Sequence, residues 1–297
     1  MDVIPVELHS YICEFACTDD GRTARSLSLV SKSFLKVIQP FLYQSIAVTG
    51  FHQIRSLELR LQNIRPHLRR VRNLYIDVIN TDQLVHKHTA IRHGSPHVKG
   101  LLAMISGTIQ TLMLSCRDPQ SSTSLIAVLF SLNYPHLREL SVVGYYPFPY
   151  LSNSMPRLTH LHLDGNRNPH GLVQLGALEG VCPQLTHLRV SGLSGAGSFA
   201  GEVADALCAD ERCSSKTKLP PQLKCLALQP GPQVQQATKM GLRDKHMVET
   251  LEKLEKFPRR NSSIRLMVLK PEGDGSLISR QRWLERLNGH EGGWPSK

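Results

Sequence analysis

The sequence predicts an α/β fold in which short parallel strands alternate with helices, preceded by a small helical domain. Three observations support this prediction. A phrase occurs twice, as PRLTHLHLDG from Pro156 and as PQLTHLRVSG from Pro183, 27 residues apart. Helix-sized apolar segments lie between several related phrases, and the first fifty residues carry apolar positions at helical spacing. We expect a helical domain over residues 1–48, a stacked α/β region over 49–270, and a C-terminal capping helix and tail over 271–297, where the helix closes the last repeat.

The repeated phrase belongs to a series of the form apolar-x-x-apolar-x-apolar. Its central positions are Leu74, Leu112, Leu140, Leu161, Leu188, Leu226 and Met267. Each copy contains a stretch of period two, which is typical of a strand, and one strand–helix unit cannot bury its own apolar face. The units must therefore stack. The series resembles degenerate leucine-rich repeats, and this resemblance implies an irregular solenoid with parallel strands.

The outward-facing residues of these strands form a candidate binding surface. Side chains alternate between the two faces of a strand, so residues next to the inward-facing Leu161 and Leu163 point outward. The outward positions predicted to bind a protein substrate are Tyr75, Asp77, Met113, Glu139, Ser141, His160, His162, Asp164, His187 and Arg189. A metal site formed by His160, His162, His187 and Asp164 is the alternative interpretation. We favour partner binding, because outward polar residues of solenoids commonly serve that purpose, and we expect no metal.

Residues 4–46 have the pattern of three short helices. Pro5 suits the first turn of a helix, and Leu8, Ile12 and Phe15 then recur at i, i+4 and i+7. The segment 18–21 breaks the helix, and Pro40 ends the helical run before the chain becomes extended. About 40 residues are too few to bury all these apolar groups. We therefore expect part of this apolar surface to meet a partner or the repeats.

The segments IPVEL, LSLVSKSF and PFLYQSI, together with Ile12, resemble the F-box of fungal F-box-like proteins with leucine-rich repeats. The chain departs from the family pattern with Ile4 in place of leucine, with Ser31 where cysteine is frequent, and in the loop 19–23. The resemblance implies docking on the Skp adaptor of an SCF-type cullin–RING ubiquitin ligase, with the repeats holding the substrate. The implied adaptor contacts are Ile4, Pro5, Leu8, Ile12, Leu29 and Val30, whereas Leu27 and Phe34 are expected to support the helical core. The alternative is a repeat-based interaction scaffold without ligase coupling, in which these helices only cap the solenoid.

Enzyme signatures are not found in the sequence. It contains no Gly-x-Ser-x-Gly, no Gly-Lys-Ser/Thr loop and no His-Glu-x-x-His. The segment SGLSGAGSFAG from Ser191 comes close to a dinucleotide fingerprint, but its glycine spacing does not match. We therefore expect a non-catalytic substrate receptor without a cofactor, which acts by raising the effective concentration of the substrate near the ubiquitin-conjugating enzyme.

Charge and cysteine content limit the remaining possibilities. The net charge is +11, with its densest part at Arg55, Arg60, Arg65, Arg69, Arg70 and Arg72. No nucleic-acid-binding signature accompanies this cluster, so we interpret it as a solvated basic face and do not expect nucleic-acid binding.

The seven cysteines are scattered along the chain. Two pairs, Cys13–Cys17 and Cys208–Cys213, have the spacing of half a zinc site, but no second pair of ligands follows either one. They are expected to be reduced, which favours the cytoplasm or nucleus. The best apolar stretch, residues 125–132, is only eight residues long, well short of the 18 or more that a membrane helix needs.

Overall fold

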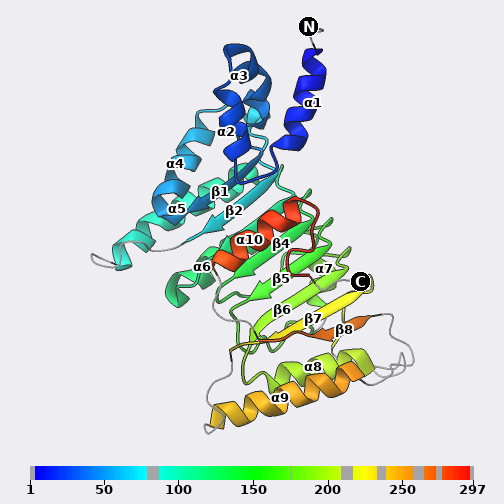
Figure 1. Cartoon of the computed structure of the whole chain (residues 1–297). Helices are drawn as coiled ribbons and strands as arrows, with labels where there is room; N and C mark the ends of the chain where they lie inside the picture. The colour runs from blue at the N-terminus through cyan, green and yellow to red at the C-terminus, as the bar shows by residue number, and fades with distance from the viewer. Residues whose placement is uncertain are drawn as a thin grey trace. The chain divides into compact units, whose positions relative to one another are not determined.

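The computed structural model of the chain describes residues 4–78, 87–174, 176–208, 217–232, 239–256, 264–271 and 276–294. The fold is α/β, as predicted, with parallel strands that follow one another in chain order (Figure 1). The chain divides into two compact units, Met1–Ser115 with Ser276–Lys297, and Cys116–Gly275. This division differs from the predicted one, because the first three strands belong with the N-terminal helices.

Three short helices open the first unit. They are α1 (Val6–Ala16), α2 (Arg22–Ser28) and α3 (Lys32–Ile38), followed by a 3-10 turn over Gln39–Phe41. Their common core is made by Cys13, Cys17, Ala24, Ile38 and Phe41, with Leu27, Phe34, Val37 and Leu42 packed against it. The predicted break between the first two helices, the end near Pro40 and the supporting roles of Leu27 and Phe34 are all confirmed.

Local hydrogen bonds explain where α2 and α3 begin. The Asp19 carboxylate accepts hydrogen bonds from the backbone N–H groups of Gly21 and Thr23, both at 2.9 Å, and from the Thr23 hydroxyl at 2.8 Å. The Ser31 hydroxyl accepts the N–H of Phe34 at 3.1 Å and so caps α3. Ser31 therefore has a structural role as the N-cap residue of α3.

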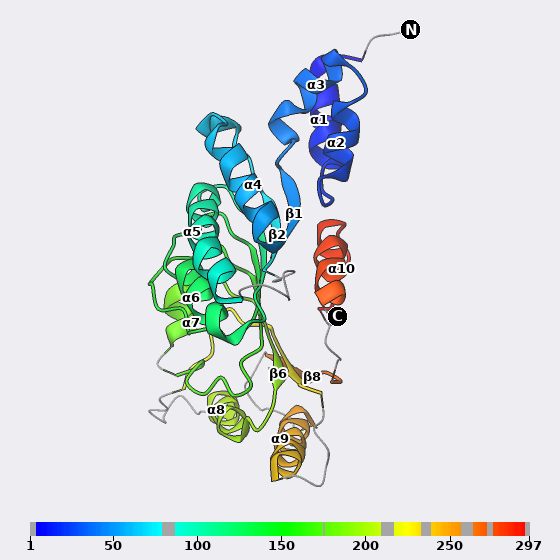
Figure 2. The same ribbon diagram turned by 90° about the vertical axis from the view of Figure 1, so that its left-hand side faces the viewer.

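Three parallel strands continue the first unit. They are β1 (Ser45–Thr49), β2 (Asn73–Asp77) and β3 (Thr111–Ser115), joined by α4 (Gly50–Gln62) and α5 (Lys87–Ile105). Leu74 pairs with Leu112, as the series predicts. Figure 2 shows α4 and α5 on one side of these strands. The Gln44 side chain donates to the carbonyl oxygens of Glu14 (2.8 Å) and Cys17 (3.3 Å), which fastens the helices to β1.

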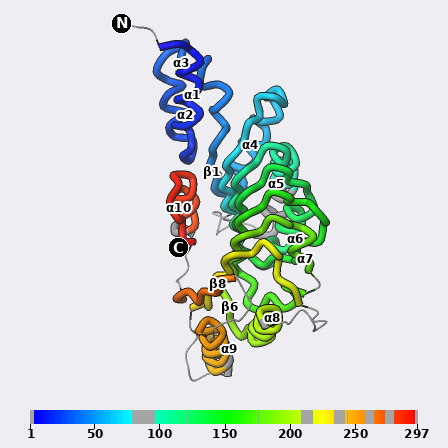
Figure 3. Tube along the Cα trace, turned by 90° about the vertical axis from the view of Figure 1, so that its right-hand side faces the viewer, coloured from blue at the N-terminus to red at the C-terminus, as the bar shows by residue number. Residues whose placement is uncertain are grey.

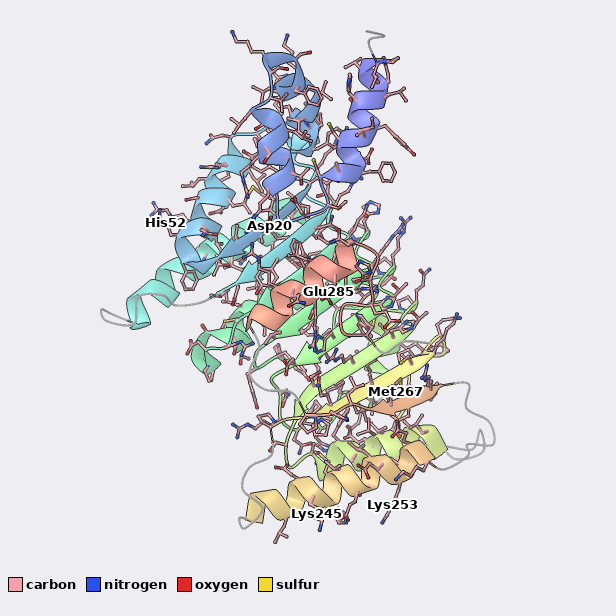
Figure 4. All side chains as sticks on the ribbon, in the orientation of Figure 1. Asp20, His52, Lys245, Lys253, Met267 and Glu285 are labelled. Atoms are coloured by element: carbon pink, nitrogen blue, oxygen red, sulfur yellow. The ribbon has the colours of Figure 1, made fainter. Side chains whose placement is uncertain are left out.

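The C-terminal helix α10 (Ser276–Leu287) does not close the last repeat as predicted, because it belongs to the first unit. It lies on the side of β1 and β2 opposite α4 and α5 (Figure 3). The Trp283 ring is 5.8 Å from the Tyr75 ring, and Arg280 forms an ion pair with the buried Asp20, which is labelled in Figure 4. Trp283 of α10 is thus buried against β2, a strand near the start of the chain.

The second unit holds five parallel strands and four helices among its described residues. The strands are β4 (Glu139–Val143), β5 (His160–Asp164), β6 (His187–Leu193), β7 (Cys225–Pro230) and β8 (Arg265–Val268). The helices are α6 (Pro119–Phe130), α7 (Ala177–Val181), α8 (Gly197–Cys208) and α9 (Lys239–Lys256). Leu140, Leu161, Leu188 and Leu226 share one register, as predicted.

The predicted register of the last copy is wrong by one residue. Leu226 pairs with Leu266, whereas Met267, labelled on β8 in Figure 4, pairs with Ala227. The segment IRLMVL is apolar at nearly every position, so its pattern fits either register.

Glycine recurs at the same position in three successive repeats, directly after β4 and β5 and near the end of β6. Gly144, Gly165 and Gly192 have φ angles of 144°, 105° and 75°, which side chains rarely adopt. A Cβ on Gly165 would lie 2.7 Å from the carbonyl oxygen of Gly144. The glycine that ends both copies of the repeated phrase is therefore required by close stacking of the turns.

Within the described residues, no helix combines the length and apolar character that a membrane crossing needs.

Candidate protein-interaction surfaces

Helix α1 carries apolar side chains on two opposite sides. One side buries Cys13 and Cys17 in the core of the helical domain. The other side shows Leu8, Ile12 and Phe15 with 52%, 55% and 62% of their surface exposed. Because successive residues of a helix are about 100° apart, these three side chains form one stripe that faces away from the core.

The turn after α2 carries a second exposed apolar pair. Leu29 and Val30 are 85% and 63% exposed, although Leu27 and Phe34 on either side pack against the helical core. All the predicted adaptor-contact residues are exposed, namely Ile4, Pro5, Leu8, Ile12, Leu29 and Val30. We call these six residues the N-terminal apolar surface.

Two aromatic residues extend this surface and were not among the predicted contacts. Tyr11 is 61% exposed, and its ring contacts the Phe15 ring edge-on with the centroids 4.7 Å apart. Tyr11 lies three residues after Leu8 and four before Phe15, so the helical spacing that identified the stripe also includes it.

The strands of the second unit align the predicted substrate-face residues in three rows. Glu139, His160 and His187 form the first row; Ser141, His162 and Arg189 form the second; and Val143, Asp164 and Ser191 form the third. The register inferred from the sequence is therefore confirmed for β4, β5 and β6. Burial alternates along β5 but not along β6, where Arg189 and Ser191 are both buried.

A hydrogen-bond network crosses the second row. His162 bonds through Nδ1 to the Ser141 hydroxyl at 3.1 Å and through Nε2 to the Ser191 hydroxyl at 2.9 Å. Arg189 donates to the Gln229 amide oxygen at 2.7 Å. Arg189 is only 2% exposed, so its prediction as a substrate contact is corrected. Its guanidinium forms a hydrogen bond within the second unit instead.

The repeated Thr-His pairs hold two stacked histidine rings. The Thr159 hydroxyl donates to the Arg138 carbonyl oxygen (3.1 Å), and the Thr186 hydroxyl donates to the Thr159 carbonyl oxygen (2.9 Å). Each hydroxyl also hydrogen-bonds to Nδ1 of the following histidine, at 3.0 Å for His160 and 2.9 Å for His187. The two rings stack with centroids 4.2 Å apart and planes 5° apart. The pairing of Thr-His in both phrases thus produces one ordered stack.

The predicted substrate contacts in the first unit are buried. Tyr75, Asp77 and Met113 are 1%, 4% and 5% exposed, and Tyr75 lies against Trp283 of α10. Their prediction as contact residues is therefore corrected. For Tyr75 the cause is Trp283 of α10, whose contact with β2 the repeat pattern does not reveal.

The cysteine pair Cys13–Cys17 lies in the helical core as free thiols. Burial, with smaller contributions from the charges of Cys13 and Asp19, raises the pKa of Cys17 to about 11. Such a thiol remains protonated and unreactive near neutral pH. In the parts of the chain that the structure describes, no group of three or more His, Cys, Asp or Glu side chains is placed to hold a metal. Cys213 of the second pair lies outside those parts.

The glycine-rich loop before α8 is held by a side chain of the same unit. Asp244 of α9 accepts the N–H of Gly195 at 2.5 Å and the hydroxyl of Ser194 at 3.3 Å. A nucleotide phosphate would require such backbone donors. The loop is therefore explained as a connection between β6 and α8 that is held by α9.

The arginine cluster has both structural and exposed members. Arg69 donates to the carbonyl oxygens of Ile64 (2.8 Å) and Gln62 (3.1 Å) after α4, and Arg72 forms an ion pair with Glu14. Arg55, Arg60, Arg65 and Arg70 are exposed.

Comparisons with known proteins do not assign the chain to a family. No protein-family model matches it, and no curated protein matches it significantly.

Proposed function

We propose that the chain is a non-catalytic substrate receptor of an SCF-type cullin–RING ubiquitin ligase, which binds the Skp adaptor through the N-terminal apolar surface. The observation that carries this proposal is the exposure of all six implied adaptor contacts. The two residues assigned to the core, Leu27 and Phe34, are packed there instead. The residues that the F-box resemblance assigns to the adaptor are therefore the exposed ones, and those that it assigns to the core are the packed ones.

The energetics favour a partner over a simple cap. Burying a large apolar side chain is worth about 1.5–3 kcal/mol, so exposed leucine, isoleucine and valine side chains forgo a sizeable stabilisation. A terminal cap of a solenoid instead presents a polar outer face to water. The outward side of α1 is apolar, with Leu8, Ile12 and Phe15 exposed. Such a surface is typical of a protein-binding site.

The second unit supplies the candidate substrate-binding surface. After the corrections above, it consists of Glu139, Ser141, His160, His162, Asp164 and His187, which lie on adjacent strands. In this mechanism the chain breaks no bond. It holds a substrate at high effective concentration near the conjugating enzyme, without a cofactor. Reduced, buried thiols are consistent with a place in the cytoplasm or nucleus.

Calorimetric titration of the purified chain with purified Skp adaptor tests the proposal. The wild-type chain should bind, and both Leu29→Glu and the double variant Pro5→Ala/Leu8→Ala should weaken binding on the order of a hundredfold, because they remove apolar contacts or bury a charge. Leu59→Glu is the matched control, since Leu59 is a 43% exposed leucine on α4 of the same unit. Circular dichroism should show all variants folded. Equal binding by the double variant would refute the proposed interface.

A further inference from the structure

A serine with a basic flank lies beside the N-terminal apolar surface. The sequence Arg22-Thr-Ala-Arg-Ser-Leu-Ser28 places Arg25 three residues before Ser28 and Arg22 six residues before it. Both arginines are exposed, and Leu29 follows at the next position. Arginine-directed serine kinases select substrates by charge, through a basic side chain three residues before the serine.

The geometry at Ser28 suits a modification site. Ser28 is the last residue of α2 and is half-buried, and its hydroxyl donates to the Arg25 carbonyl oxygen at 2.6 Å. The chain leaves the helix at Leu29 and is extended at Ser31, with φ −163° and ψ 163°. A helix of seven residues has little stability of its own. The end of α2 can therefore open locally for a kinase that binds extended substrates.

We infer that Ser28 is a phosphorylation site for an arginine-directed protein kinase, and that phosphate at Ser28 closes the N-terminal apolar surface to the adaptor. The second part rests on the proposed function. In the reaction the Ser28 oxygen attacks the γ-phosphorus of a nucleoside triphosphate bound to the kinase. The bond from that phosphorus to the nucleoside diphosphate breaks, and the hydroxyl proton passes to a base of the kinase.

The phosphate would act through its charge and its position. It carries about −1.5 to −2 charges at pH 7 and lies one residue from Leu29, about 3.8 Å between Cα atoms. An adaptor that covers Leu29 and Val30 would have to desolvate this charge beside apolar groups. We expect the affinity to fall on the order of a hundredfold.

The first experiment locates the phosphate. The full chain is incubated with ATP and the catalytic subunit of cyclic-AMP-dependent protein kinase, and the sites are mapped by mass spectrometry. Ser262→Ala/Ser263→Ala serves as the background, because Arg259 and Arg260 make that segment a competing substrate. Phosphate should appear on Ser28, disappear in Ser28→Ala and decrease strongly in Arg25→Ala. Ser26→Ala, the matched control on the same helix, should leave it unchanged. An unmodified Ser28 in a chain phosphorylated elsewhere would overturn the inference.

The second experiment titrates the Ser28-phosphorylated and unmodified samples with purified Skp adaptor. Binding only by the unmodified sample supports the inference. Equal binding by both samples overturns the closing role of the phosphate while leaving the proposed function intact. Failure of the unmodified sample to bind overturns the proposed function and the switch together. The phosphate content measured on the same samples separates these results.

Discussion

The N-terminal helices and the strands of the second unit use the same residue type in opposite ways. Leu140, Leu161, Leu188 and Leu226 are buried in one register, where each packs between neighbouring repeats. Leu8 and Leu29 of the helical domain are more than half exposed, although they lie next to a packed core. An apolar sequence pattern therefore predicts a surface that must be covered, but it does not predict whether the chain itself covers that surface.

The largest effect is expected for Leu188→Ala in β6. The side chain is fully buried, so its truncation leaves a cavity and should lower the free energy of unfolding by about 2–5 kcal/mol. Urea unfolding followed by circular dichroism measures this change. A loss of unfolding free energy below about 1 kcal/mol would mean that Leu188 is not tightly packed between neighbouring repeats.

Gly165→Ala should destabilise the second unit by about 1–3 kcal/mol, because residue 165 has positive φ and its new Cβ would meet the Gly144 carbonyl oxygen. Gly180→Ala is the matched control, since Gly180 lies in α7 with open space around it. Alanine there should be neutral or stabilising. Equal losses in the two variants, measured by thermal unfolding, would argue against close stacking of the turns.

Asp19→Ala should cost about 1 kcal/mol, because it removes the carboxylate that accepts three hydrogen bonds at the start of α2. Asp205→Ala, at an exposed position on α8, should change stability by less than about 0.5 kcal/mol. Chemical unfolding of both variants checks the difference. A neutral Asp19→Ala would show that the loop 17–21 does not define the helix start.

The smallest effect on stability is expected for Leu29→Ser. Its side chain is exposed, so the free energy of unfolding should change by less than about 0.5 kcal/mol. This result would sharpen the contrast with Leu188. A loss as large as that of Leu188→Ala would show that Leu29 is covered by the chain itself.

The sequence pattern predicts local and repeating features well. The rows Leu140–Leu161–Leu188 and Ser141–His162–Arg189 follow from the two-residue period of strands and the spacing of the phrases. The exposure of Leu29 beside the packed Leu27 was anticipated from the F-box resemblance. Helical spacing alone would have grouped Leu27 with Val30, which is exposed.

Long-range packing could not be read from the pattern. Nothing local to Trp283 indicates that it lies against Tyr75, some two hundred residues earlier, and the burial of Tyr75 follows from that contact. The sequence pattern does not reveal helix α4, because its apolar positions Ile54, Leu57 and Leu61 are interspersed with arginines.

Amide hydrogen exchange of the chain with and without purified Skp adaptor tests the central claim most directly. We expect slower exchange over α1 and over residues 28–31 when the adaptor is added, with no change over β4 to β6. Unchanged exchange in these N-terminal segments at saturating adaptor would contradict the assignment of the exposed apolar surface to that partner.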